Sequence, residues 1–195
     1  MEVDMTVNRG EPGYFVGVEV TRDRGGLVES YRSSQRGIAS YSIKRALTLN
    51  DRVSDIISAV RGIVERPEYR SSNTTLLINT SILGRPIIQK LKSELPECQM
   101  VKIIASETKP GSEPLHIPIL DIEAILRLLT EAKQIVVQEE HSCSDVKKAI
   151  LEEALRSFRL KLGYLADTAP KIWAEGDAGH LVIATGLACW AAECL

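Results

Sequence analysis

The spacing of apolar residues changes once along this chain, near residue 50. Before that point, three short runs rich in apolar and β-branched residues predict strands over Tyr14–Val20, Leu27–Ser33 and Ile38–Leu47. The connections between these runs are short and contain turn-forming residues. We therefore expect an antiparallel meander of three strands.

After residue 50, apolar residues recur three and four positions apart, which is typical of amphipathic helices, and short strands lie between them. The predicted elements are a helix within residues 50–67, a strand over Thr74–Asn79, a helix over Pro86–Leu95, a strand over Val101–Ala105, a helix over Ile119–Ala132, a strand over Gln134–Val137 and helices over Asp145–Leu162 and His180–Glu193. The last helix is apolar almost all round, so we expect it to lie covered against a sheet. This order predicts an α/β fold, with a mixed central sheet of an antiparallel three-strand meander plus parallel strands, flanked by helices.

Length and composition fit one globular domain. The chain has 195 residues, of which 44% are hydrophobic and 26% charged, so it can bury a core without disulfides or metals. We expect a flexible segment over residues 1–13 and a single domain over residues 14–195. No signal sequence and no membrane-spanning apolar run is found, which predicts a soluble, cytoplasmic protein without a membrane partner.

The charge balance excludes binding of nucleic acid by bulk electrostatics. There are 24 basic and 26 acidic residues, giving a formal charge of -2, so DNA binding would need a local patch. Basic residues cluster at residues 22–24, 32–45 and 156–161. Whether these clusters share a face stays open in the sequence, and solvated faces are the alternative interpretation.

The cysteines do not indicate a metal or redox site. Four cysteines are scattered with no C-x-x-C pair, which favours reduced thiols. His141 and Cys143 lie close together, and we interpret them as part of a polar loop before a helix.

Three stretches carry polar residues at the ends of predicted strands or the start of a helix. They read Gly17-Val18-Glu19-Val20, then INTSILGRPII over residues 78–88, and AEGDAGHLVIATGLA over residues 174–188. The second stretch runs from a strand into a helix that opens on proline, where a missing N–H costs nothing. No G-x-x-x-x-G-K-[ST] loop, G-x-S-x-G elbow or H-E-x-x-H motif occurs.

At these three places the chain resembles the nuclease domain of phage terminase large subunits, the DNA-packaging motor family, and beyond it the ribonuclease H-like nucleases. The resemblance runs from Tyr14 onward and keeps the order of the motifs. It implies a ribonuclease H-like fold, Mg²⁺ or Mn²⁺ as cofactor, DNA as substrate and phage packaging proteins as partners. In that family clustered carboxylates hold two divalent ions about 3.5–4 Å apart, which activate water and stabilise the leaving oxygen.

The residues implied for the catalytic site are Glu19, Asn79, Asp177 and His180, and the metal ligands implied are Glu19, Asp177 and His180. The sequence departs from the family pattern at each motif. Glu19 stands where the family has aspartate, Asn79 replaces the aspartate after the fourth strand, and Gly179 and His180 replace paired aspartates. Glu175 is a further acidic residue nearby. A two-metal site offsets about four positive charges, and the three motif positions supply about one negative charge, which predicts an eroded site.

Each of these residues also has a plain structural interpretation. Glu19 could pair with an arginine or lysine, Asn79 could cap the turn after its strand, and His180 could be an ordinary first-turn helix residue. Arg22, Arg24 and Arg85 are the candidate nucleic-acid contacts.

Three hypotheses follow from the sequence. The first is a stand-alone terminase nuclease-like domain of phage or prophage origin with an eroded site, which binds nucleic acid or serves as a scaffold. The second is a divergent metal-dependent nuclease using Glu19, Asp177 and His180, with Asn79 as an outer ligand. The third is a protein-interaction module without nucleic acid, and the oligomeric state stays open under all three.

Overall fold

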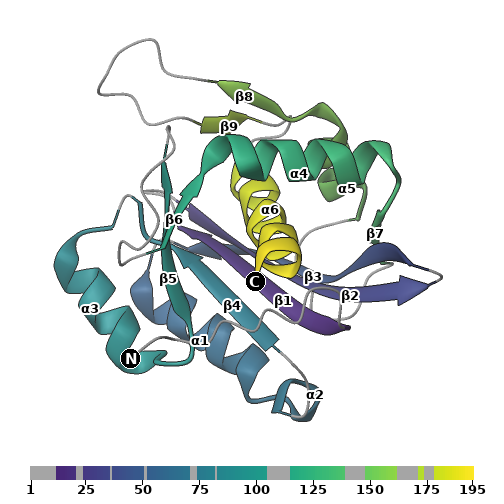
Figure 1. Ribbon diagram of the computed structural model, residues 1–195. Helices are drawn as coiled ribbons and strands as arrows, with labels where there is room; N and C mark the ends of the chain where they lie inside the picture. Colours follow the sequence, from purple (N-terminus) through teal and green to yellow (C-terminus); the bar gives the residue numbers. More distant parts are fainter. Residues whose placement is uncertain are drawn as a thin grey trace, which may run out of the picture.

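In the computed structural model of the chain, a seven-stranded mixed sheet separates two layers of helices (Figure 1). The structure describes residues 12–20, 24–35, 37–50, 52–70, 74–81, 83–104, 115–138, 148–161, 171–173 and 178–195. The predicted flexible segment falls largely outside these ranges, since the description begins at Pro12 and the first strand at Gly13.

The strands of the main sheet are β1 (Gly13–Val20), β2 (Arg24–Gln35), β3 (Ile38–Asn50), β4 (Thr74–Asn79), β5 (Gln99–Ile104), β6 (Leu115–Pro118) and β7 (Ile135–Val137). Their spatial order is β6-β5-β4-β1-β2-β3-β7. The pairs β1–β2 and β2–β3 are antiparallel, and the other neighbours run parallel. The predicted meander followed by parallel strands is confirmed.

The helices are α1 (Val53–Val64), α2 (Pro67–Arg70), α3 (Arg85–Glu94), α4 (Ile119–Glu131), α5 (Lys148–Ser157) and α6 (Gly179–Cys194). The predicted helix over Asp145–Leu162 was too long, because it ends at Ser157 and a two-stranded hairpin of β8 (Arg159–Lys161) and β9 (Lys171–Trp173) follows. The first strand of the hairpin reads Arg-Leu-Lys, which lacks the apolar run that indicates a buried strand.

Each face of the sheet has its own hydrophobic core. Alternate residues of β1 point to opposite sides, so Val16, Val18 and Val20 pack toward α1 and α3. On the other face, α6 lies across β1 and β2, with α4 beside it (Figure 1). Twelve residues of α6 are buried, which explains its uniformly apolar sequence.

Gly17 makes the close approach of β1 to α6 possible. A Cβ built on Gly17 would lie 2.0 Å from the backbone oxygen of Ala184, far inside a van der Waals contact. Only glycine lets the helix backbone pack directly on this strand.

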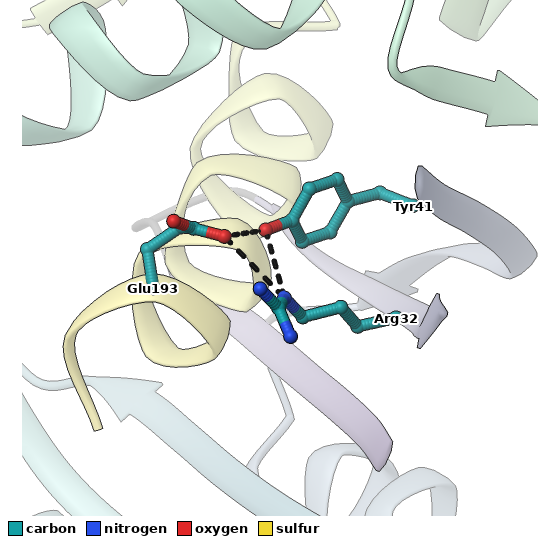
Figure 2. A network of polar contacts seen from close by, with 3 residues as sticks. All are labelled: Arg32, Tyr41 and Glu193. Atoms are coloured by element: carbon teal, nitrogen blue, oxygen red, sulfur yellow. Dashed lines mark hydrogen bonds and ion pairs between the residues drawn. The ribbon is translucent and has the colours of Figure 1, made fainter. Parts of the chain in front are cut away.

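The last turn of α6 is fastened to the sheet by a polar cluster (Figure 2). The Tyr41 hydroxyl of β3 donates to Glu193 Oε1 of α6. Arg32 Nε of β2 lies 3.2 Å from the Tyr41 oxygen and 3.4 Å from Glu193 Oε1. Arg32 and Tyr41 face each other across the β2–β3 ladder, so two strands hold one helix end.

No described helix is long and apolar enough to cross a membrane. This agrees with the sequence, in which no apolar run of that length was found.

Candidate functional site

The candidate site lies at the sheet edge where the parallel strands β1 and β4 end, under the first turn of α6. Glu19 is the next-to-last residue of β1, and Asn79 is the last residue of β4. Both are off the α1 face, since Val18 and Ile78 beside them pack into the α1 core. The sheet therefore brings together two residues that are 60 positions apart in the chain.

Asn79 donates through Nδ2 to Glu19 Oε2 at 2.6 Å. Its Oδ1 accepts the backbone N–H of Ser81 at 3.0 Å, the Ser81 hydroxyl at 2.5 Å and the backbone N–H of Ile103 at 3.3 Å. Because two backbone N–H groups can only donate, they determine which end of the amide is oxygen. The amide is thus held from both ends.

The bond from Ser81 to Asn79 closes an Asx-turn after β4. Capping of this turn by Asn79 was the plain interpretation of the residue, and the geometry agrees with it. Thr80 supports the same turn by donating its hydroxyl to the Val101 carbonyl at 2.9 Å. The Asn79 amide therefore links β4, the turn and β5 to Glu19.

Glu19 is 6% exposed. Burial raises the pKa of its carboxyl from 4.5 to about 8, and the hydrogen bond from Asn79 lowers it only in part. Within the described ranges no arginine or lysine forms an ion pair with Glu19, so the alternative that it pairs with a basic residue finds no partner there. The carboxyl is mainly protonated at neutral pH.

His180 is in the first turn of α6 and is 8% exposed. A Cβ on Gly26 would lie 2.9 Å from His180 Cδ2 and 2.9 Å from its backbone oxygen, so ring and backbone pack directly on β2. Gly26 is the register partner of Glu19. Glu19, Asn79 and His180 are therefore gathered at one end of α6, as the motif order predicted.

The structure describes few of the other expected site residues. Asp177 and Glu175 lie outside the described residues, and so do Arg22, His141 and Cys143. Arg24 opens β2, but its side chain is not described. Arg85 is the first residue of α3 and is exposed.

The described residues do not fit a two-metal site. No three His, Cys, Asp or Glu side chains among them are close enough to hold a metal ion. Mg²⁺ prefers several oxygen ligands in near-ideal octahedral geometry. Here Glu19 is the one carboxyl contributed by β1 and β4, and the Asn79 oxygen already accepts three hydrogen bonds.

Where the structure describes them, residues of the basic clusters do not form one patch. Arg32 is buried on the α6 face with Glu193, whereas the Lys44 ammonium lies over the ring of Tyr31. Arg156 is paired with Glu153 on the surface of α5, and Arg66 is paired with Glu29. Sequence order could not reveal this division, because it depends on which face of the sheet each side chain takes.

Comparison with known proteins gives similarity in fold. No family model and no curated protein matches the chain. The nuclease domain of the large terminase of Thermus phage P74-26 superposes with a TM-score of 0.51 at 17% identity, covering 91% of this chain and 78% of that chain. The large terminase (g2p) nuclease domain of bacteriophage SPP1, determined with bound Mn, has a TM-score of 0.52 at 15% identity, covering 90% of this chain and 84% of that chain.

These comparisons agree with the strand order, in which an antiparallel meander is joined to parallel strands through β1 and β4. They confirm the fold implied by the three motifs. The chain has a ribonuclease H-like fold of the type found in the nuclease domains of phage large terminases.

Proposed function

We propose that this chain is a terminase nuclease-like domain of phage or prophage origin that has lost two-metal catalysis and acts by binding nucleic acid or as a scaffold for packaging proteins. One observation carries the proposal. The Asn79 oxygen, which stands where the family has a metal-binding aspartate, is occupied by donors from Ser81 and Ile103.

The charge of the site supports the same proposal. Two divalent ions carry about four positive charges. Among the described residues, Glu19 supplies the one carboxyl at the site that could compensate them. Burial raises the pKa of that carboxyl to about 8, so a metal would also have to displace its proton.

The positions of two candidate arginines in the fold support a binding role. β1 and β2 are antiparallel, with Val20 opposite Gly25, so Arg24 begins β2 at the edge where β1 ends. Arg85 begins α3 soon after β4 ends at the same edge. Arg24 and Arg85 would offer contacts to phosphates around the candidate site.

The proposal is tested by incubating the purified chain with plasmid and branched DNA in Mg²⁺ or Mn²⁺. We expect no metal-dependent cleavage by the wild type or by Glu19→Ala. Salt-dependent retention on immobilised DNA is expected, since phosphate contacts weaken steeply as salt rises. A chain that neither cuts nor binds DNA would instead be a protein-interaction module.

A second experiment restores a carboxylate at position 79 and compares it with a control that carries the same added charge elsewhere. We expect Asn79→Asp to gain a rise in melting temperature with millimolar Mn²⁺ that the wild type lacks, because ligands that bind only the folded state stabilise it. Gln89→Glu adds the same charge at an exposed position of α3 and serves as the control.

The divergent nuclease is the second candidate, because Gly26 brings Glu19 and His180 to one place. Histidine suits Mn²⁺ or Zn²⁺ better than Mg²⁺. Cleavage in Mn²⁺ by the wild type, abolished in both Glu19→Ala and Asp177→Ala, would establish this candidate and overturn loss of catalysis.

A further inference from the structure

A row of tyrosines crosses the sheet on the α1 face, at the end of β1 opposite to the candidate site. Tyr14 near the start of β1 packs against the core under α1. Its register partner on β2 is Tyr31, and the two ring centroids are 4.9 Å apart. On the other side, the ring of Tyr69 from α2 lies 4.6 Å from Tyr14.

The row ends at a basic side chain. Lys44 of β3 holds its ammonium nitrogen 5.8 Å from the ring centroid of Tyr31, in a cation–π arrangement. The same nitrogen donates to Gln138 Oε1 at 3.1 Å. Lys44 and Arg45 are both partly exposed, so this end of the row carries positive charge at the surface.

Past the row, the residues that the structure describes on this sheet face are uncharged. Ser42, the register partner of Tyr31, and Ser33, two residues further along β2, are partly exposed on the same face. Val136 of β7 pairs with Ser42 and is 47% exposed, and Ile38 near the hairpin turn is 63% exposed. In Figure 1 the β2–β3 hairpin runs on beyond α1 and α3, so these helices leave its far end uncovered.

The acidic residues near the row are Glu29 of β2, whose register partner is Arg45 of β3, and Glu68 of α2. Glu29 is 4% exposed and is paired with Arg66 at 3.6 Å. Glu68 is on α2, which carries Tyr69 at the other end of the row. The surface over Tyr31 and Lys44 therefore combines partly exposed aromatic rings, hydroxyl groups and positive charge.

We infer that this surface, defined by Tyr14, Tyr31, Ser33, Ser42, Lys44 and Val136, binds single-stranded nucleic acid. Aromatic rings on a sheet stack with unpaired bases, and a neighbouring lysine neutralises a phosphate. Bases in a duplex are already stacked on each other and cannot reach the rings, so the strand bound here is single. The inference rests on the proposed nucleic-acid role and locates a contact surface on the face opposite to α6.

Fluorescence anisotropy with labelled oligo(dT) of about 20 nucleotides tests the inference, because single-strand sites of about 4–16 nucleotides fit within that length. We expect Tyr31→Leu to weaken binding about 10-fold and Tyr31→Phe to retain it, since loss of one stacked base is worth this much. Lys44→Gln is expected to weaken binding several-fold and to lower the slope of log affinity against log salt by about 0.7. Lys90→Gln, on exposed α3, removes the same charge elsewhere and is the control.

Thermal melts show whether each variant is folded, and competition with unlabelled duplex of the same length shows the preference for single strands. If the wild type binds neither single-stranded nor duplex DNA, the proposed nucleic-acid role fails and this inference fails with it. If the wild type binds and Tyr31→Leu and Lys44→Gln bind equally well, the proposed function stands and this surface is not the site. If Tyr31→Leu is unfolded, the salt slope of Lys44→Gln and cross-linking of 5-iodouracil DNA to Tyr31 decide the question.

Discussion

The two ends of α6 differ in whether a buried ionisable side chain has an oppositely charged partner. At its C-terminal end, the buried guanidinium of Arg32 meets the carboxylate of Glu193, whose side chain is 38% exposed, together with the Tyr41 hydroxyl. At its N-terminal end, the buried carboxyl of Glu19 meets the neutral amide of Asn79. The guanidinium charge of Arg32 is compensated, whereas the Glu19 carboxyl has no basic partner among the described residues.

This difference separates a charge-compensated cluster at the C-terminal end of α6 from the candidate site at its N-terminal end. Glu29 is also buried, and it is paired with Arg66, as Arg32 is paired with Glu193. A buried carboxyl without a cation is costly in a protein that has no use for it, and such groups gather at functional sites. Among the described residues the partner of Glu19 is the Asn79 amide, which is what the proposed loss of the metal site would leave.

The largest expected effect is that of Glu19→Gln on stability at alkaline pH. A folded-state pKa near 8 against an ordinary 4.5 means that the contribution of Glu19 is fully present below pH 4.5 and is lost as pH rises to about 8. Glutamine does not titrate, so the variant should exceed the wild type in free energy of unfolding by roughly 3–4 kcal/mol at pH 8 and by under about 1 kcal/mol at pH 5. Urea unfolding across this pH range measures the gap.

Glu65→Gln, at the exposed end of α1, is the control for loss of one carboxylate. A gap for Glu19→Gln that does not widen with pH would mean that Glu19 is compensated by a cation, and the contrast between the two ends of α6 would disappear.

The second-largest change in stability is expected for Glu193→Ala. It leaves the guanidinium of Arg32, which is 9% exposed, with the Tyr41 hydroxyl as its remaining partner. Removing one member of a buried pair is costly, and the partial exposure of Glu193 reduces that cost, so we expect a loss of about 2–3 kcal/mol in urea unfolding. Glu131→Ala on the exposed end of α4 should change stability by less than about 0.5 kcal/mol. A small effect of Glu193→Ala would show that this cluster does not hold the helix.

The smallest of the three effects is expected for Gly26→Ala. The added methyl would meet both the ring and the backbone of His180, and overpacking of this kind costs about 1–2 kcal/mol. Gly62→Ala in α1 meets no atom within 4 Å and should instead stabilise the chain by about 0.5–1 kcal/mol. Thermal melts of both variants, with the NMR shift of the His180 ring, check that α6 rests on β2 at this point; an unshifted ring would contradict the packing.

Much of the fold could be predicted from local pattern. Alternating and apolar runs predicted the strands, because the side chains of a pleated strand point alternately to its two faces. Residues 180–193 are apolar almost all round, which predicted a helix covered on several sides. Asn79 lies at the end of a strand and His180 in the first turn of a helix, as the motifs indicated, whereas Glu19, expected in the middle of its strand, is the next-to-last residue of β1. The hairpin of β8 and β9 was missed, because its strands, Arg-Leu-Lys and Lys-Ile-Trp, are short and begin with a basic residue, whereas the equally short β7 is wholly apolar.

The state of the site was decided by tertiary structure. In the sequence Asn79 is only an amide in place of a carboxylate, and whether its oxygen is free depends on Ser81 and on Ile103, which β5 brings beside it. The titration of Glu19 depends on burial under α6, more than 150 residues away in the chain. Local residues thus determine which elements form, because side-chain period and backbone preference act over a few positions. Packing determines which polar atoms are buried together, and therefore what chemistry is left.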